Sequence, residues 1–368
     1  ELADKLAAMV PVPDARLFFS NSGSEANDSQ IKMLRYYSNA IGKPQKKKII
    51  ALDRGYHGVT VAAASLTGLP VMHSHFDLPV EALGILRADC PHYFRGKLGD
   101  ESEGEFVSRL LKNIEKIIFE EGADTIAAFI AEPLMGAGGV IVPPEGYLPK
   151  VQALLNEHGI LLWADEVICG FGRTGNDFGS TTMGIKPDLM SLAKQLSSAY
   201  IPISAAVIPG EMYEAMVDQS AEVGVFGHGY TYTGHPVACA AALKALEIYE
   251  RDDLFAEAAK MGVHMQSRLQ EFAGHELVGE VRGKGLIGAV ELVANKETGQ
   301  AFNDGRVGAF AQRACQDAGL LLRVVSGSSV AFCPPLIIEE DQINEMVEKF
   351  STALASTLEY AKKENLIQ

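Results

Sequence analysis

Paired cysteines, long apolar runs and a basic surplus are all missing from this sequence. Its five cysteines are an odd number with no CxxC pair, so neither a disulfide framework nor a metal site is indicated. Reduced thiols of this kind are typical of a cytoplasmic protein. There is no run of about 18 apolar residues and no basic amphipathic stretch, so we expect no contact with a membrane. A formal net charge of −15 repels phosphate backbones, so we expect no nucleic-acid partner.

The order of the apolar runs predicts an α/β fold with two domains. Short runs at 49–52, 126–131, 160–164 and 189–193 alternate with helical stretches such as 149–158, as in a parallel sheet covered on both faces. We expect a large domain at 21–250, built on a mostly parallel sheet, and a smaller α+β C-terminal domain at 251–368. Residues 1–20 begin inside a helical pattern, and we interpret them as the remnant of an N-terminal segment with a first helix, in a longer protein.

Polar residues that directly follow predicted strands are the first candidates for a site, because ligands collect at the carboxyl ends of parallel strands. Glu132, Asp165 and Lys194 occupy such positions. A carboxylate at a buried strand end needs a partner, so Asp165 is either half of a structural ion pair or an acid held against a cationic ring nitrogen. Lys194 closes an apolar strand. Poor hydration there favours a neutral amine that can form a Schiff base, whereas a lysine that reaches back to water has no such role.

Small residues ahead of a predicted helix offer an anion site. Gly23 and Ser24 precede a helix with apolar positions Ile31 and Leu34, and the free N–H groups and dipole of a helix start can hold a phosphate. An ordinary helix cap has the same appearance. Tyr56, after another strand, offers an aromatic face or merely packs within its loop. A phosphate cradle, an acid for a ring nitrogen and a poorly hydrated lysine are together what pyridoxal phosphate (PLP) requires of a protein.

The stretch GFGRTG at 170–175 follows a strand and matches the GxGxxG pattern of dinucleotide sites. Such a site needs a helix that opens at the motif and an acid about 20 residues further on. Asn176, Asp177, Gly179 and Ser180 predict a continuing loop instead. The pattern therefore argues against a nicotinamide enzyme.

Several ordered motifs resemble those of the class III, fold type I, PLP-dependent aminotransferases, and within them the ω-amine:pyruvate transaminases. They are NSGSEAN at 21–27, YHG at 56–58, AEPLMGAGGV at 131–140, DEVICGFGRTG at 165–175, KPDLMSLAK at 186–194 and TYTGHP at 231–236. The resemblance implies that Lys194 carries PLP as a Schiff base and that Asp165 keeps the ring nitrogen protonated. It also implies phosphate contacts from Gly23 and Ser24, ring contacts from Tyr56 and Val167 on opposite faces, an acid near the ring hydroxyl at Glu132, and a contact from Thr233 to the phosphate of the neighbouring subunit's cofactor.

The substrates implied by the resemblance are an amine or ω-amino acid as donor and a keto acid, with pyruvate expected, as acceptor, in a homodimer with shared sites or a tetramer. Arg323 matches a mobile arginine that binds the keto-acid carboxylate, or else is a surface residue of its strand; the following VVSGSS departs from the family's acidic pattern. Tyr56 and Ala137 are further substrate contacts. Three alternatives stay open: a dialkylglycine decarboxylase, an aminomutase, and an inactive truncated homologue acting as a subunit-interaction protein.

Overall fold

The computed structural model describes residues 1–367 and divides the chain into two compact units. The first unit comprises Glu1–Met135, Pro143–Phe171 and Asp177–Asp252. The second unit comprises Gly136–Val142, Gly172–Asn176 and the part of the chain from Asp253 onward. Two short segments that follow strands of the first unit therefore belong to the second.

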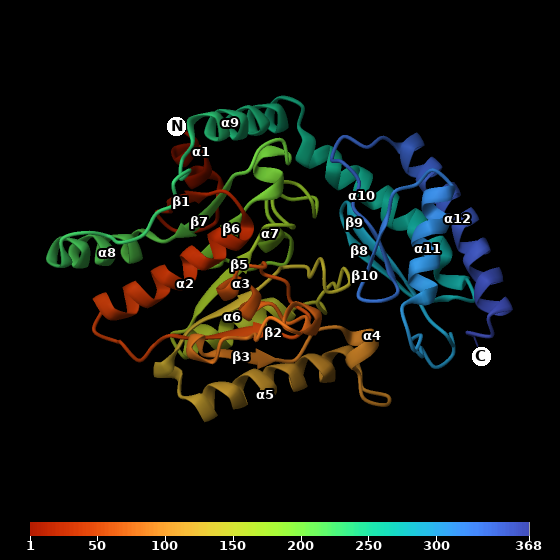
Figure 1. The fold of residues 1–368 in the computed structure, drawn as a ribbon, viewed down its shortest axis with the longest axis horizontal. Coiled ribbons are helices and arrows are strands. Elements are labelled where there is room, and N and C mark those ends of the chain that lie inside the picture. Colours follow the sequence, from red (N-terminus) through yellow and green to blue (C-terminus); the bar gives the residue numbers. More distant parts are fainter. Residues whose placement is uncertain (368) are drawn as a thin grey trace. The chain divides into compact units, whose positions relative to one another are not determined.

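A seven-stranded sheet forms the centre of the first unit, in the order β1-β7-β6-β5-β4-β2-β3 (Figure 1). The five strands from β2 to β6 are parallel, and β7 is antiparallel to both of its neighbours. Every residue of β4 is buried, as expected for a strand covered on both faces. The predicted α/β fold with a mostly parallel sheet is confirmed. The strands are β1 (Arg16–Ser20), β2 (Lys48–Leu52), β3 (Ile85–Ala88), β4 (Ile126–Ala131), β5 (Leu161–Asp165), β6 (Leu189–Leu192) and β7 (Ser204–Ile208).

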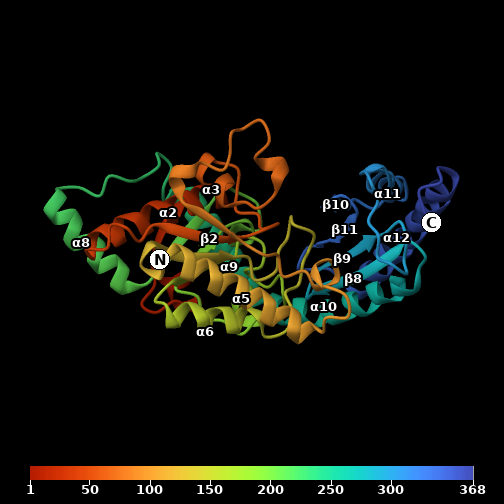
Figure 2. The same ribbon diagram turned by 90° about the horizontal axis from the view of Figure 1, so that it is seen from below.

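Helices cover both faces of this sheet (Figure 2). α2 and α3 lie on one face and α5 and α6 on the other, as right-handed crossovers in this strand order require. The helices of the first unit are α1 (Leu2–Met9), α2 (Gly23–Ala40), α3 (Val61–Leu66), α4 (Tyr93–Gly96), α5 (Glu103–Glu121), α6 (Tyr147–Glu157), α7 (Gly179–Thr182), α8 (Gly210–Val223) and α9 (Pro236–Arg251).

The second unit is a four-stranded antiparallel sheet, in the order β10-β11-β9-β8, with three long helices. Its strands are β8 (Val278–Lys284), β9 (Ile287–Leu292), β10 (Arg323–Val325) and β11 (Ser329–Phe332), and its helices are α10 (Leu254–Gln270), α11 (Arg306–Asp317) and α12 (Glu340–Lys363).

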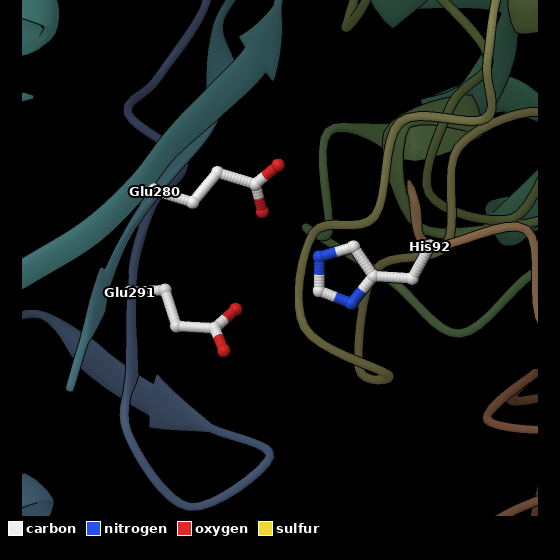
Figure 3. A group of neighbouring side chains, drawn as sticks. All are labelled: His92, Glu280 and Glu291. Carbon is white, nitrogen blue, oxygen red and sulfur yellow. The ribbon is translucent and has the colours of Figure 1, made fainter. Parts of the chain in front are cut away.

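A buried arginine ties the segment Gly136–Val142 to this second sheet. Arg282 donates to the carbonyl oxygens of Gly139 and Val140 and forms ion pairs with Glu280 and Glu291 at 2.6 and 2.5 Å. Figure 3 shows these two carboxylates projecting from β8 and β9 on the same side. A buried guanidinium needs hydrogen-bond and charge partners, and two of those partners are carbonyl oxygens of this segment. The arginine therefore fixes the segment Gly136–Val142 to the sheet.

Two local differences from the sequence-based expectations have simple causes. β1 was not predicted, because its residues RLFFS include Arg16 and are mostly only partly buried, so they form no continuous apolar run and become a strand by pairing with β7. Gly179 and Ser180 begin the short helix α7 and do not continue a loop, since the carboxylate of Glu166 binds their N–H groups. Within residues 1–367, no helix has the length and apolar character needed to cross a membrane.

Candidate active site

One pocket of the first unit brings together most of the residues that the sequence singled out. Its volume of about 440 Å³ is typical of a small-molecule site. Parallel strands place their carboxyl ends at one edge of the sheet, so residues that follow β1, β2, β4, β5 and β6 meet there. Seven of the predicted cofactor residues line this pocket: Gly23, Ser24, Tyr56, Glu132, Asp165, Val167 and Lys194.

Asp165 is the last residue of β5, and its buried carboxylate is held by three hydrogen-bond partners. His57 Nδ1 lies 2.9 Å from Oδ2, and Asn27 Nδ2 donates to the same oxygen at 3.0 Å. The backbone N–H of Val167 donates to Oδ1 at 3.1 Å. Each carboxylate oxygen accepts about two hydrogen bonds, so Oδ1 retains capacity for one further donor.

His57 and Asn27 are site residues to which the sequence analysis gave no role. Both are buried, and Asn27 Nδ2 also donates to the carbonyl oxygen of His57 at 2.6 Å. One signal was present in the sequence. Asn27 lies on the same helical stripe as Ile31 and Leu34, and a polar residue within a buried stripe needs a partner.

The start of α2 forms one wall of the pocket. Ser22 caps the helix by accepting from the N–H of Glu25 at 3.2 Å, so the N–H groups of Gly23 and Ser24 belong to the first turn, where a helix offers no internal partner. Gly58 packs against this turn with φ of +128°, and a Cβ there would lie 2.5 Å from Ser24 Oγ. Only glycine allows so close an approach in this backbone conformation.

Tyr56 and Val167 come to the pocket from the segments after β2 and after β5. The N–H of Tyr56 donates to Oε1 of the buried Glu132 at 2.9 Å, so Glu132 fixes the backbone of the tyrosine. Val167 packs closely on Gly23, where an added Cβ would lie 3.0 Å from Val167 Cγ2.

Lys194 follows β6 with a φ of +44°, a conformation that is uncommon for a residue with a side chain. Backbone outliers of this kind concentrate at functional sites. The side chain is exposed in the single chain, contrary to the expectation of a poorly hydrated amine. The side chains of β6 are buried on the faces of the sheet, whereas Lys194 lies beyond the end of this strand.

Glu166, directly after Asp165, faces away from the pocket lining and is completely buried. Its carboxylate accepts from the N–H of Gly179 at 2.9 Å and from the N–H and hydroxyl of Ser180 at 2.6 and 2.5 Å. Burial raises the pKa of Glu166 to about 7, although the bonds from Ser180 and Gly179 oppose the shift. This residue ties the end of β5 to α7.

The three other predicted residues lie outside the pocket lining. Thr233 is half-buried in the turn before α9, where its Oγ1 accepts from the N–H of Tyr230 at 3.0 Å. Ala137 and Arg323 belong to the second unit, and Arg323 is exposed at the start of the edge strand β10. Their predicted contacts stay predictions.

The pocket residues fit PLP. The first turn of α2 provides unpaired N–H groups for a phosphate, Asp165 Oδ1 can accept from a ring nitrogen, and Lys194 stands at the end of a neighbouring strand. Two buried atoms, Asn27 Oδ1 and His57 Nε2, have no hydrogen-bond partner among the described residues. Buried polar atoms of this kind need a partner that the described residues do not supply, such as water or a ligand.

Comparison with known proteins agrees with this chemistry. The model of the aminotransferase class-III family matches residues 1–354. The chain is 48% identical over 361 residues to gamma-aminobutyrate transaminase 1, mitochondrial, of Oryza sativa subsp. indica, covering 98% of this chain and 69% of the rice protein.

Among solved structures, the omega transaminase from Pseudomonas jessenii in complex with PMP superposes with a TM-score of 0.95 and 52% identity, over 98% of this chain and 79% of that one. A transaminase with L-Ala superposes equally well, at 51% identity, over 98% of this chain and 84% of that one. A family model over nearly the whole chain, the fold and the pocket agree: this protein belongs to the class III aminotransferases, the PLP-dependent enzymes that transfer amino groups.

Proposed function

We propose that the protein is an ω-transaminase that takes the amino group from an amine or ω-amino acid and gives it to a keto acid, with pyruvate as acceptor. The observation that carries this proposal is the single pocket where Lys194, Asp165 and the start of α2 meet. The similarity to gamma-aminobutyrate and omega transaminases supports a donor with a terminal amine. L-alanine, held by a similar transaminase, is the amino acid that pyruvate yields when it accepts an amino group.

Bound PLP supplies an aldehyde that captures the amine and a ring that takes up electrons as the proton beside nitrogen leaves. Lys194 would hold that aldehyde through Nζ, and its free amine would carry the proton as general base and then as general acid. Asp165 would accept from the ring N–H and keep the ring nitrogen protonated. His57 and Asn27 fix the orientation of the Asp165 carboxylate. The N–H groups of Gly23 and Ser24 bind the phosphate.

The remaining residues orient the ring and choose the substrate. Tyr56 and Val167 would contact the ring of the cofactor, and Glu132, which accepts from the N–H of Tyr56, would lie near its hydroxyl. Ala137 and Tyr56 contact the donor, and Arg323 binds the carboxylate of the keto acid, since a guanidinium matches a planar carboxylate.

We further propose a homodimer in which Thr233 donates to the phosphate of the neighbouring subunit's cofactor. Three large apolar side chains support this, because they lie exposed in the segments after Lys194 and around Thr233: Tyr200 (89%), Tyr232 (64%) and Val237 (60%). We propose that these side chains form one apolar patch, a feature typical of protein interfaces. The sequence-based expectation of a cytoplasmic protein stays a prediction.

Absorbance spectroscopy tests the catalytic proposal. We expect the purified protein to be yellow with PLP, to lose the colour with an amine donor, and to regain it with pyruvate, as a ping-pong reaction requires. Lys194→Ala should abolish the borohydride-reducible adduct, while Lys150→Ala, which removes an exposed lysine of α6, should leave it unchanged.

A reducible adduct that persists at this pocket in Lys194→Ala would refute the assignment of the lysine. Release of carbon dioxide from a dialkylglycine, or no need for a keto acid, would refute the transaminase in favour of a decarboxylase or an aminomutase. Failure to bind PLP would favour an interaction protein.

A further inference from the structure

The segment from Phe226 to Tyr230, between α8 and α9, runs along one stripe of α2. In Figure 2 the green trace that follows α8 passes over this helix. Residues 25, 29, 32 and 36 of α2 are spaced three and four apart and therefore share one face. The segment meets them in the opposite order: Tyr230 contacts Glu25 and Ser29, His228 contacts Ser29 and Lys32, and Phe226 contacts Tyr36.

Ser29 is the buried centre of this contact. His228 Nε2 lies 2.9 Å from Ser29 Oγ, and Lys32 Nζ lies 3.0 Å from His228 Nδ1. A lysine ammonium only donates, so Nδ1 accepts and the ring is neutral with its hydrogen on Nε2, which donates to Ser29. The hydroxyl of Tyr230 lies 3.3 Å from Ser29 Oγ and donates to the carbonyl of Glu25 at 3.2 Å.

Aromatic packing also holds the segment Phe226–Tyr230 against α2. We call these contacts together the anchor. Phe18 of β1 stacks on His228 with ring centroids 4.9 Å apart, and Phe226 meets Tyr36 edge-on at 5.2 Å. Burial by these rings, and then the charge of Lys32, lower the pKa of His228 below its ordinary value. Both effects favour the neutral ring that the hydrogen bonds require.

The anchored segment leads directly to Thr233. The N–H of Tyr230 donates to Thr233 Oγ1 at 3.0 Å, and the N–H of Thr233 donates to the carbonyl of Tyr230 at 3.1 Å. The threonine oxygen therefore accepts from within its own turn, which leaves its O–H as a donor. α2 thus carries Gly23 and Ser24 at its start and, through its side, holds the turn that contains Thr233.

We propose that Ser29, His228 and Tyr230 are positioning residues that bind the Thr233 turn to α2 and so hold the two phosphate-binding elements of one chain in fixed relation. This rests on the proposed function, in which Thr233 serves the neighbouring subunit's cofactor. Cofactor retention in one subunit then depends on α2 of the other.

The anchor is also sensitive to pH. The titratable groups that face His228 are Lys32 from α2 and Tyr230 from its own segment. Protonation of His228 removes the acceptor for Lys32 and places two cations side by side. Because the pKa of His228 is lowered, the contacts are complete above its ordinary pKa of about 6.5 and are lost as the pH falls through the lowered pKa.

The rate of PLP release from the dimeric holoenzyme tests this inference without measuring turnover. We expect Thr233→Ala, Tyr230→Phe and His228→Leu each to release PLP about ten-fold faster, the effect of one lost hydrogen bond. Thr233→Ala combined with His228→Leu should add little, because both act through one contact. His228→Gln keeps a donor and an acceptor, so it should match the wild type at pH 8 and lack the faster release that the wild type shows at pH 5.5. His264→Gln, on α10, is the control that should change nothing.

These outcomes distinguish failure of the positioning role from failure of the proposed role of Thr233. Fast release in Thr233→Ala with wild-type release in His228→Leu and Tyr230→Phe would overturn the positioning role alone. Additive effects in the double variant would do the same. Normal release in Thr233→Ala would remove the proposed role of Thr233, and the inference with it.

Discussion

Asp165 and Glu166 are consecutive carboxylates with opposite surroundings. Asp165 ends β5 and lines the pocket, while the side chain of the next residue, Glu166, binds the first residues of α7. Asp165 is held by His57 and Asn27, whereas Glu166 receives only a hydroxyl and two backbone N–H groups. The end of β5 thus carries a proposed catalytic carboxylate, Asp165, followed by a structural carboxylate, Glu166.

Glu166 should make stability depend on pH. A carboxyl whose pKa is raised from 4.5 to about 7 by burial binds its proton more tightly when folded, so its favourable contribution is complete below pH 4.5 and is lost as pH rises through 7. Relative to Glu166→Gln, the wild type should lose roughly 3 kcal/mol of unfolding free energy between pH 4.5 and pH 8. Urea unfolding of both proteins at the two ends of this range measures the difference. The same pH dependence in both would contradict the assignment.

Arg323→Ala tests the keto-acid contact. We expect KM for pyruvate to rise by about ten-fold or more, since a charge-assisted pair is lost, while the half-reaction with an uncharged amine changes little. Stopped-flow measurement of the two half-reactions separates the effects. Equal losses in both would indicate that Arg323 has only a structural role in β10.

At the scale of elements, the site depends on how closely the Gly58 turn meets the start of α2. We expect Gly58→Ala to lower the unfolding free energy by about 1–3 kcal/mol and to speed PLP release, because the new Cβ would strike Ser24 Oγ. Gly42→Ala is the matched control, with a positive φ and no atom within 4 Å, and should cost only about 1 kcal/mol with normal PLP release. Equal acceleration of PLP release by the two variants would show that backbone strain, and not the contact with Ser24, is the cause.

Elements with strong local patterns could be predicted from the sequence. The strands at 49–52, 126–131, 160–164 and 189–193 appear within one residue of their observed bounds, because each is a short apolar run between turns. The prediction of helix 149–158 is likewise confirmed within two residues by α6. Local sequence does not report pairing, so it missed β1, whose register depends on β7 far along the chain.

At the scale of the whole molecule, the proposed dimer is the main expectation. Tyr200→Asp should weaken dimerisation by about 2 kcal/mol, roughly thirty-fold in Kd, because it replaces an aromatic side chain of the proposed interface. Phe119→Asp is the control, since Phe119 on α5 is as exposed (88%) as Tyr200 (89%) but lies away from the segments around Lys194 and Thr233. Sedimentation of both variants measures the effect, and equal weakening would contradict the assigned interface.

The sequence by itself determined the chemistry, because PLP needs particular groups at strand ends and helix starts, and these have local signatures. Asp165, Lys194 and Gly23 were predicted in this way, and the structure brings them to one pocket. Tertiary structure alone decided what surrounds them. His57 and Asn27 reach Asp165 across 108 and 138 residues because the sheet order brings the ends of β1, β2 and β5 to one edge. Tertiary structure also decided the exposure of Lys194, because a side chain's contact with water depends on what packs over it and not on its neighbours in sequence.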